Sequence, residues 1–179
     1  MIHTVSAIRR ALAGAAVLAV AAVLAAPGPA AAQSDNVPSE KFGDWALSCR
    51  AADKDQPERC ALIQNIVFKQ SSKRVLNIQV TRPAPDKPYI AAVTAPLGIL
   101  LQAGLVLMVD DKELVRFPLM ICNVNGCMGQ FPVSDDVRAS MAGGKSGKVI
   151  IRQPNGRAVG IEFSLNGYKG GMDALVAKN

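Results

Sequence analysis

Several short stretches of the chain alternate apolar and polar residues one by one, which is the pattern of half-buried β-strands. The clearest lies at residues 74–82, where Leu76, Ile78 and Val80 are separated by polar residues. Trp45, in an earlier alternating stretch, is predicted to belong to the core, since a tryptophan on a strand of a sandwich is usually buried. Further strands are predicted at residues 42–49, 60–69 and 89–95.

The middle of the chain is more apolar and predicts more deeply buried strands. Residues 105–109 are continuously apolar, which suits a central strand covered on both faces. A polar turn at 110–113 leads into residues 114–122, and residues 128–133 run back. These three strands, joined by short turns, predict an antiparallel meander.

Only two stretches favour helix. Ser134 is a suitable N-cap, Asp135 and Asp136 suit the positive end of a helix, and Gly143 can end it. A hairpin is predicted over residues 148–165, and the C-terminal tail is expected to form one or two helical turns. About eight or nine short strands with turns every 8 to 12 residues are typical of an all-β sandwich or barrel.

The N-terminal segment predicts export from the cytoplasm. Arg9 and Arg10 precede an uncharged run of small and apolar residues at 11–26, and residues 30–32 end in the Ala-x-Ala pattern of a cleavage site. A membrane anchor is the alternative, but this run is shorter than the roughly 20 residues that span a bilayer. The prediction is a signal peptide at residues 1–32, a flexible lead-in at 33–41 and a single domain at 42–179, placed in the periplasm or outside the cell.

Histidine is almost absent, which narrows the chemistry. The only one, His3, lies in the predicted signal peptide, so the rest of the chain lacks the commonest general base and metal ligand. The carboxylate pairs Asp110/Asp111 and Asp135/Asp136 fall where a turn and a helix cap would use them. We therefore expect no catalytic residue, cofactor or metal, and a hydrolase built on carboxylates alone is only a third, weaker hypothesis.

An even number of cysteines in an exported chain predicts disulfides. Three pairings are open, and the two local pairs are favoured because each flanks a plausible turn. The second pair has the spacing C-x4-C, unlike the C-x-x-C of redox centres, and Asn125 and Gly126 are expected to supply its left-handed turn. The residues concerned are Cys49, Cys60, Cys122 and Cys127.

The chain carries a formal net charge of +6, and basic residues gather in its last third. Residues 137–161 contain five of them and no acidic residue, which suggests a patch facing an anionic polymer or lipid. An ordinary solvated surface is the alternative. The absence of aromatic residues from this stretch argues against stacking on nucleic-acid bases. The five are Arg138, Lys145, Lys148, Arg152 and Arg157.

Residues 142–149 contain two Gly-Lys pairs, as phosphate-binding loops do. Neither pair has the preceding glycine at the spacing that such a loop requires, because alanine stands at positions 139 and 142. We therefore expect a flexible surface loop.

Several segments, in the order "FGDWALSC", "CALIQ", "APLGILLQAGLVLMVDD", "PLMICNVNGCMGQFPV" and "SLNGY", resemble the invasion-associated locus B proteins of Gram-negative bacteria. The resemblance covers about residues 41–177. It implies a small exported β-sandwich with immunoglobulin-like layering, linked in pathogenic relatives to entry into host cells. It also supports the two local cysteine pairs, and it implies no active-site residues.

The leading hypothesis is therefore a non-enzymatic exported β-sandwich that acts by surface contact with envelope or host-cell components. The alternative is a periplasmic protein that binds a small ligand or lipid in the space between its sheets.

Overall fold

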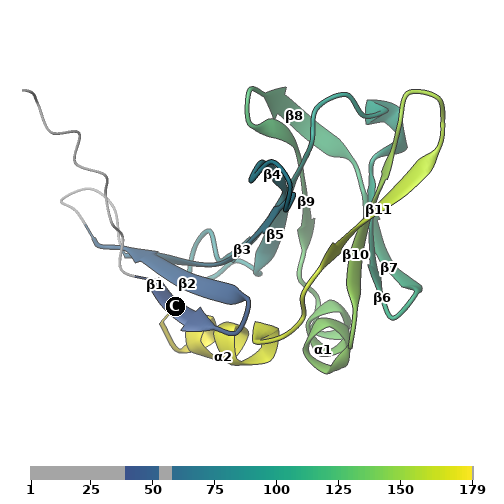
Figure 1. The fold of residues 1–179 in the computed structure, drawn as a ribbon. Coiled ribbons are helices and arrows are strands. Elements are labelled where there is room, and N and C mark those ends of the chain that lie inside the picture. The colour runs from purple at the N-terminus through teal and green to yellow at the C-terminus, as the bar shows by residue number, and fades with distance from the viewer. Residues whose placement is uncertain (1–38, 53–57, 179) are drawn as a thin grey trace, which may run out of the picture. The chain divides into compact units, whose positions relative to one another are not determined.

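The computed structural model describes residues 39–52 and 58–178, so the predicted signal peptide lies outside the described residues. Two antiparallel sheets make up most of the described chain, with helices α1 (Asp135–Gly143) and α2 (Tyr168–Lys178) and a short 3-10 helix, η1 (Leu101–Ala103) (Figure 1). The larger sheet has the strand order β1 (Ser39–Phe42), β2 (Trp45–Arg50), β3 (Arg59–Val67), β4 (Arg74–Thr81), β5 (Ile90–Ala95), β9 (Gly126–Pro132) and β8 (Leu119–Asn123). The smaller sheet has the order β11 (Ala158–Phe163), β10 (Gly147–Arg152), β6 (Leu105–Val109) and β7 (Lys112–Phe117).

The core lies between the two sheets and is built by the strands whose patterns predicted burial. The three alternating aliphatic residues of β4 are at most 1% exposed, and four of the five residues of β6 are buried. Phe117 from the smaller sheet packs on Phe131 from the larger one, with ring centroids 4.7 Å apart. The predicted all-β sandwich is confirmed.

The predicted meander is wrong, because residues 114–122 do not form one strand. β7 ends at Phe117 and β8 begins at Leu119, so the chain passes from the smaller sheet to the larger one at Pro118. Proline has no N–H to donate to a ladder, which makes it suited to such a change of sheet. As a result β7 pairs with β6, whereas β8 pairs with β9.

A buried polar network joins the start of the larger sheet to the segment that follows β11. Gln64 is only 4% exposed, and its side-chain NH2 donates to the carbonyl oxygens of Asp44 (3.2 Å) and Ser164 (3.1 Å). Its carbonyl oxygen accepts from the N–H of Ser164 (3.0 Å), and the indole N–H of Trp45 donates to the Ser164 carbonyl (2.9 Å). Trp45 is 1% exposed, so its predicted place in the core is confirmed.

Helix α1 lies near the β6–β7 turn of the smaller sheet (Figure 1), and α2 packs against β1, β2 and β3 of the larger sheet. The hydroxyl oxygen of Ser134 accepts from the N–H of Val137 (3.3 Å), which confirms the predicted N-cap of α1. α2 is longer than predicted, since it runs for 11 residues and packs Tyr168 edge-on against Trp45 (5.2 Å between centroids). A side chain at Gly171 would collide with Leu62, so this glycine lets the helix approach the sheet closely.

Two local predictions need correction. Of the expected flexible lead-in at 33–41, residues 39–41 belong to β1, which pairs with β2, and residues 33–38 lie outside the described residues. The left-handed turn expected at Asn125-Gly126 does not form. The turn residues are 124 and 125, and in this hairpin only Gly126 has a positive φ (133°). Two consecutive left-handed residues occur instead at Asp110 and Asp111, with φ of 48° and 63°.

Candidate functional site

Four connections lie at the same end of the two sheets. Ala95 ends β5 and pairs with Cys127, next to the β8–β9 turn, and the N–H of Leu100 donates to the carbonyl of Arg152 (2.7 Å) beside the β10–β11 turn. Figure 1 shows the connections after β5, β8 and β10 together at the top of the view. With the β3–β4 turn, which the register of the larger sheet places at this end, they form a surface that we name the loop end. It comprises residues 67–74, 96–104, 120–125 and 152–157.

The loop end holds almost all the large apolar side chains that the described residues expose. Val124, at the tip of the β8–β9 turn, is 92% exposed, and Met120 in β8 is 64% exposed. Of the eight such side chains, only Val176 in α2 lies elsewhere. Such a gathering is typical of interaction surfaces, because single exposed apolar residues are normally scattered. The seven are Val67, Phe68, Leu97, Leu101, Met120, Ile121 and Val124.

The same surface is basic. The loop end contains five exposed basic residues and no acidic residue. None of the five forms an ion pair with an acidic residue of the described chain. The ion pairs of the described chain all join residues outside the loop end. The loop end therefore presents a positive potential that the protein itself leaves unneutralised. The five are Lys69, Lys73, Arg74, Arg152 and Arg157.

Strand β8 forms an open edge at this end. The Cα atoms of Cys122 and Cys127 are 4.0 Å apart across the β8–β9 pair, the short spacing of a non-hydrogen-bonded pair. The N–H and C=O of Cys122 therefore point away from β9, toward the outer side of the sheet. Charged side chains commonly protect such edges, and β1, β7 and β11 all carry them, whereas β8 has none.

Both disulfides have the local pairing that was favoured from the sequence. Cys122–Cys127 closes the β8–β9 hairpin, and Cys49–Cys60 joins β2 to β3 at the other end of the larger sheet. Glu58 lies close to Cys49 and Cys60, as a metal ligand would. Both sulfurs are consumed by the disulfide, so no thiolate is left to hold a metal there.

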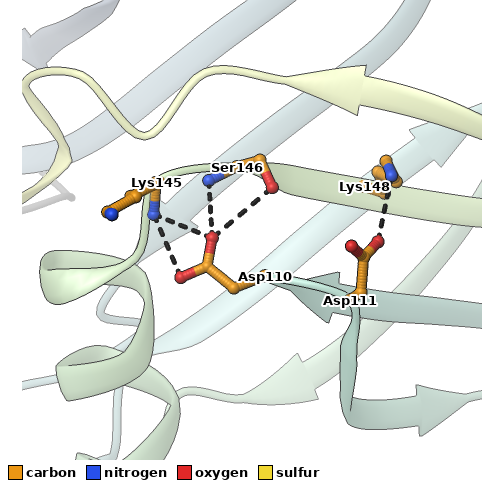
Figure 2. A network of polar contacts seen from close by, with 5 residues as sticks. All are labelled: Asp110, Asp111, Lys145, Ser146 and Lys148. Carbon is orange, nitrogen blue, oxygen red and sulfur yellow. Dashed lines mark hydrogen bonds and ion pairs between the residues drawn. The ribbon is translucent and has the colours of Figure 1, made fainter.

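The opposite end of the smaller sheet satisfies its charges internally (Figure 2). The carboxylate of Asp110 accepts from the backbone N–H groups of Ser146 (2.9 Å) and Lys145 (3.0 Å) and from the Ser146 hydroxyl. These hydrogen bonds hold the pKa of Asp110 below its usual value, and the bond from the Ser146 N–H has the largest effect. The ammonium of Lys148 pairs with Asp111 at 3.1 Å, and this hydrogen bond raises the pKa of Lys148.

The glycine- and lysine-rich segment at 142–149 therefore does receive an anion, but the anion is the protein's own Asp110 carboxylate. The backbone N–H groups that a phosphate would need are already occupied. This segment was expected to be a free surface loop, and the structure instead ties it to the β6–β7 turn. Asp110 and Asp111 form the β6–β7 turn, and both carboxylates make contacts within the protein.

The five basic residues proposed from the sequence do not form one patch. Lys148 pairs with Asp111, and Arg138 pairs with Asp173 of α2 at 3.2 Å. Lys148 and Arg152 are four strand positions apart on β10, roughly 13 Å. Arg152 and Arg157 consequently belong to the loop end, whereas Arg138, Lys145 and Lys148 lie at the opposite end among acidic partners.

Two of the hollows on the described surface are shallow and lie outside the space between the sheets. One, of about 200 Å³, separates α1 from α2 and contains Arg138, Lys169 and Asp173. The hydrogen bond from Lys169, with a smaller contribution from Arg138, lowers the pKa of Asp173. The other, of about 190 Å³, lies on the outer face of the smaller sheet beside Arg116 and Arg152. The first hollow is lined by two carboxylates, Asp135 and Asp173, but both are exposed, and Asp173 pairs with Arg138 and Lys169.

The apolar residues of the loop end were missed from the sequence because their segments were read as strands and turns. One signal was available. Met120 and Ile121 are consecutive apolar residues, which is unusual for a strand with one solvated face, and Val124 occupies a turn that usually carries polar residues.

The residues that build this fold also match known proteins. The sequence matches the family described as invasion associated locus B (IalB) protein over residues 45–176. No curated protein matches the sequence. No helix among the described residues is long and apolar enough to cross a membrane.

The fold has a counterpart among solved structures. The crystal structure of invasion associated protein B from Bartonella henselae is similar to this chain, with a TM-score of 0.70 and 21% sequence identity. The similarity covers 79% of this chain and 96% of that one. With the family match extending across most of the described sandwich, this chain belongs to the invasion associated locus B family.

Proposed function

We propose that the protein is exported and acts without catalysis, by contacting an envelope or host-cell component through the loop end. The observation that carries the proposal is the gathering of seven exposed apolar side chains beside five basic ones that form no ion pair within the described chain. Two disulfides suit an oxidising compartment outside the cytoplasm. The name of the similar Bartonella protein, invasion associated protein B, supports a role in contact with other cells.

A matched pair of substitutions tests the surface. Leu97 and Val124 are exposed in the loop end, and Val176 is exposed on α2, so serine at these positions removes apolar surface without opening the core. We expect Leu97→Ser/Val124→Ser to bind isolated envelopes and host-cell surfaces at least tenfold more weakly than the unmodified protein. Val176→Ser should bind normally. Equal binding by all three proteins would show that the loop end is not the contact surface.

A further inference from the structure

Resting on the proposed contact role of the loop end, we propose that its partner is an anionic lipid bilayer. The loop end would lie at the headgroup level, with apolar side chains entering the boundary of the acyl chains and basic side chains bound to lipid phosphates. A peripheral contact of this kind needs no membrane-spanning segment.

The arrangement of the apolar side chains fits a bilayer better than a folded protein partner. They come from three separate segments of the chain and not from one flat face, with Val124 at the tip of one turn and Leu97 in another connection. A protein partner would need a separate pocket for each. The acyl boundary of a bilayer is deformable and accepts projecting aliphatic groups wherever they lie.

The charges favour an anionic lipid. Anionic headgroups attract basic side chains near the surface, and each such side chain strengthens binding on the order of fivefold. The loop end contains five basic residues and no acidic residue. Asp110 and Asp111 lie at the opposite end of the smaller sheet, so they would be far from a membrane that the loop end contacts. This charge distribution would orient the protein as it approaches.

The backbone limits how deep the contact can go. The N–H and C=O of Cys122 point outward from β8, and an unpaired backbone group is costly in hydrocarbon. Polar side chains, among them Asn123, Asn125 and Gln153, also belong to the loop end. The surface is therefore suited to the hydrated headgroup layer. The Cys122–Cys127 disulfide holds one hairpin in place before binding, which reduces the ordering needed on contact.

Vesicle sedimentation tests the charge requirement. The probes are phosphatidylcholine vesicles and the same vesicles with phosphatidylglycerol, mixed with oxidised protein purified from the periplasm after expression of the full chain. We expect binding only with phosphatidylglycerol, weakened by salt. Lys73→Gln/Arg157→Gln should weaken it about twenty-fivefold, whereas the matched variant Lys112→Gln/Lys178→Gln, which loses two charges outside the loop end, should bind normally. Equal weakening by the two variants would overturn the proposal.

Quenching by brominated lipids tests the orientation. Trp45 is buried and contributes the same background to every variant. Val124→Trp should be quenched on phosphatidylglycerol vesicles, and Lys112→Trp, at the opposite end, should not. The reverse result, or no binding to phosphatidylglycerol vesicles, would overturn the lipid assignment.

The proposed function can survive that failure, and the two are separable. If Leu97→Ser/Val124→Ser loses contact with envelopes although no vesicle binds, the loop end contacts a protein or a glycan, and strand addition at β8 becomes the first alternative. If the same variant keeps both its envelope and its vesicle binding, the proposed function and the lipid inference both fall.

Discussion

The two ends of the smaller sheet treat their charges and apolar side chains in opposite ways. At the β6–β7 turn, the Asp110 carboxylate binds two backbone N–H groups and Asp111 pairs with Lys148, so charge is neutralised within the protein. At the loop end, basic side chains have no acidic partner among the described residues and apolar side chains such as Val124 face solvent. The charges of one end are satisfied within the chain, whereas the basic and apolar side chains of the other end face solvent, which is why we propose that end as the contact surface.

This difference suggests that stability and function are separated in space. Substitutions in the buried network and at the β6–β7 turn should lower stability, whereas substitutions of exposed side chains in the loop end, its disulfide apart, should leave stability nearly unchanged and alter binding. The expected effects below run from the largest to the smallest.

The buried amide of Gln64 should give the largest effect on stability. Gln64→Leu removes three hydrogen bonds and leaves the N–H of Ser164 without its partner, which should cost about 3 kcal/mol of unfolding free energy. Chemical denaturation measures it. Gln70→Leu, in the β3–β4 turn of the loop end, is the matched control and should change stability by less than about 0.5 kcal/mol. Similar losses in both variants would remove the contrast between the two regions.

The two disulfides compare the two ends of the larger sheet directly. Cys49–Cys60 spans 11 positions and Cys122–Cys127 spans 5. In the chain-entropy account the longer loop gains more, about 3 kcal/mol against about 2 kcal/mol. Thermal or chemical unfolding of Cys49→Ala/Cys60→Ala and Cys122→Ala/Cys127→Ala should show this order. A larger loss from the hairpin disulfide would mean that the loop end contributes more to stability than its contacts indicate.

The Asp110 carboxylate should appear as a pH dependence. Because its pKa is lowered in the folded protein, its contribution is present above the usual value near 3.8 and is lost as the pH falls through the folded pKa. Asp110→Asn tolerates the left-handed backbone and removes the charge. We expect this variant to be less stable at neutral pH and to lose less stability on acidification, measured by denaturation at several pH values. An unchanged acid profile would contradict the role of Asp110 as an internal anion.

The smallest effect on stability is expected at the tip of the loop end. Val124 is 92% exposed, so Val124→Asp should change the unfolding free energy by less than about 0.5 kcal/mol. Circular dichroism melting checks this, and vesicle sedimentation of the same sample should show weaker binding. Marked destabilisation would indicate that Val124 packs within the protein and is not available to a partner.

Local pattern predicted those elements whose burial is set by their own residues. The alternation around Ile78, the continuous apolar run of β6 and the Ser134 cap were all confirmed. The local cysteine pairs and the core position of Trp45 also agree with the structure. Each pair joins residues that are close in sequence, and the burial of Trp45 follows from its place on a strand of the sandwich.

Features that depend on contacts between distant residues were not predictable in this way. The change of sheet at Pro118 depends on which strand lies beside β7 and β8, and the length of α2 depends on the surface of β2 and β3 that covers its apolar face. The five basic residues were close in sequence, yet β10 separates them, because a strand of six residues carries its ends far apart.

The sequence by itself determined the fold class, the buried strands and the first helix, because periodicity, capping and cysteine spacing act over a few residues. It indicated the family through the resemblance of several whole segments. Only the tertiary structure decided which connections meet at the loop end. It also decided that the Asp110 carboxylate accepts hydrogen bonds from the backbone N–H groups at Lys145 and Ser146. Those outcomes follow from the pairing of strands that are far apart along the chain. Long-range pairing brought Leu97, Val124 and Arg157 to one surface, where their side chains face solvent.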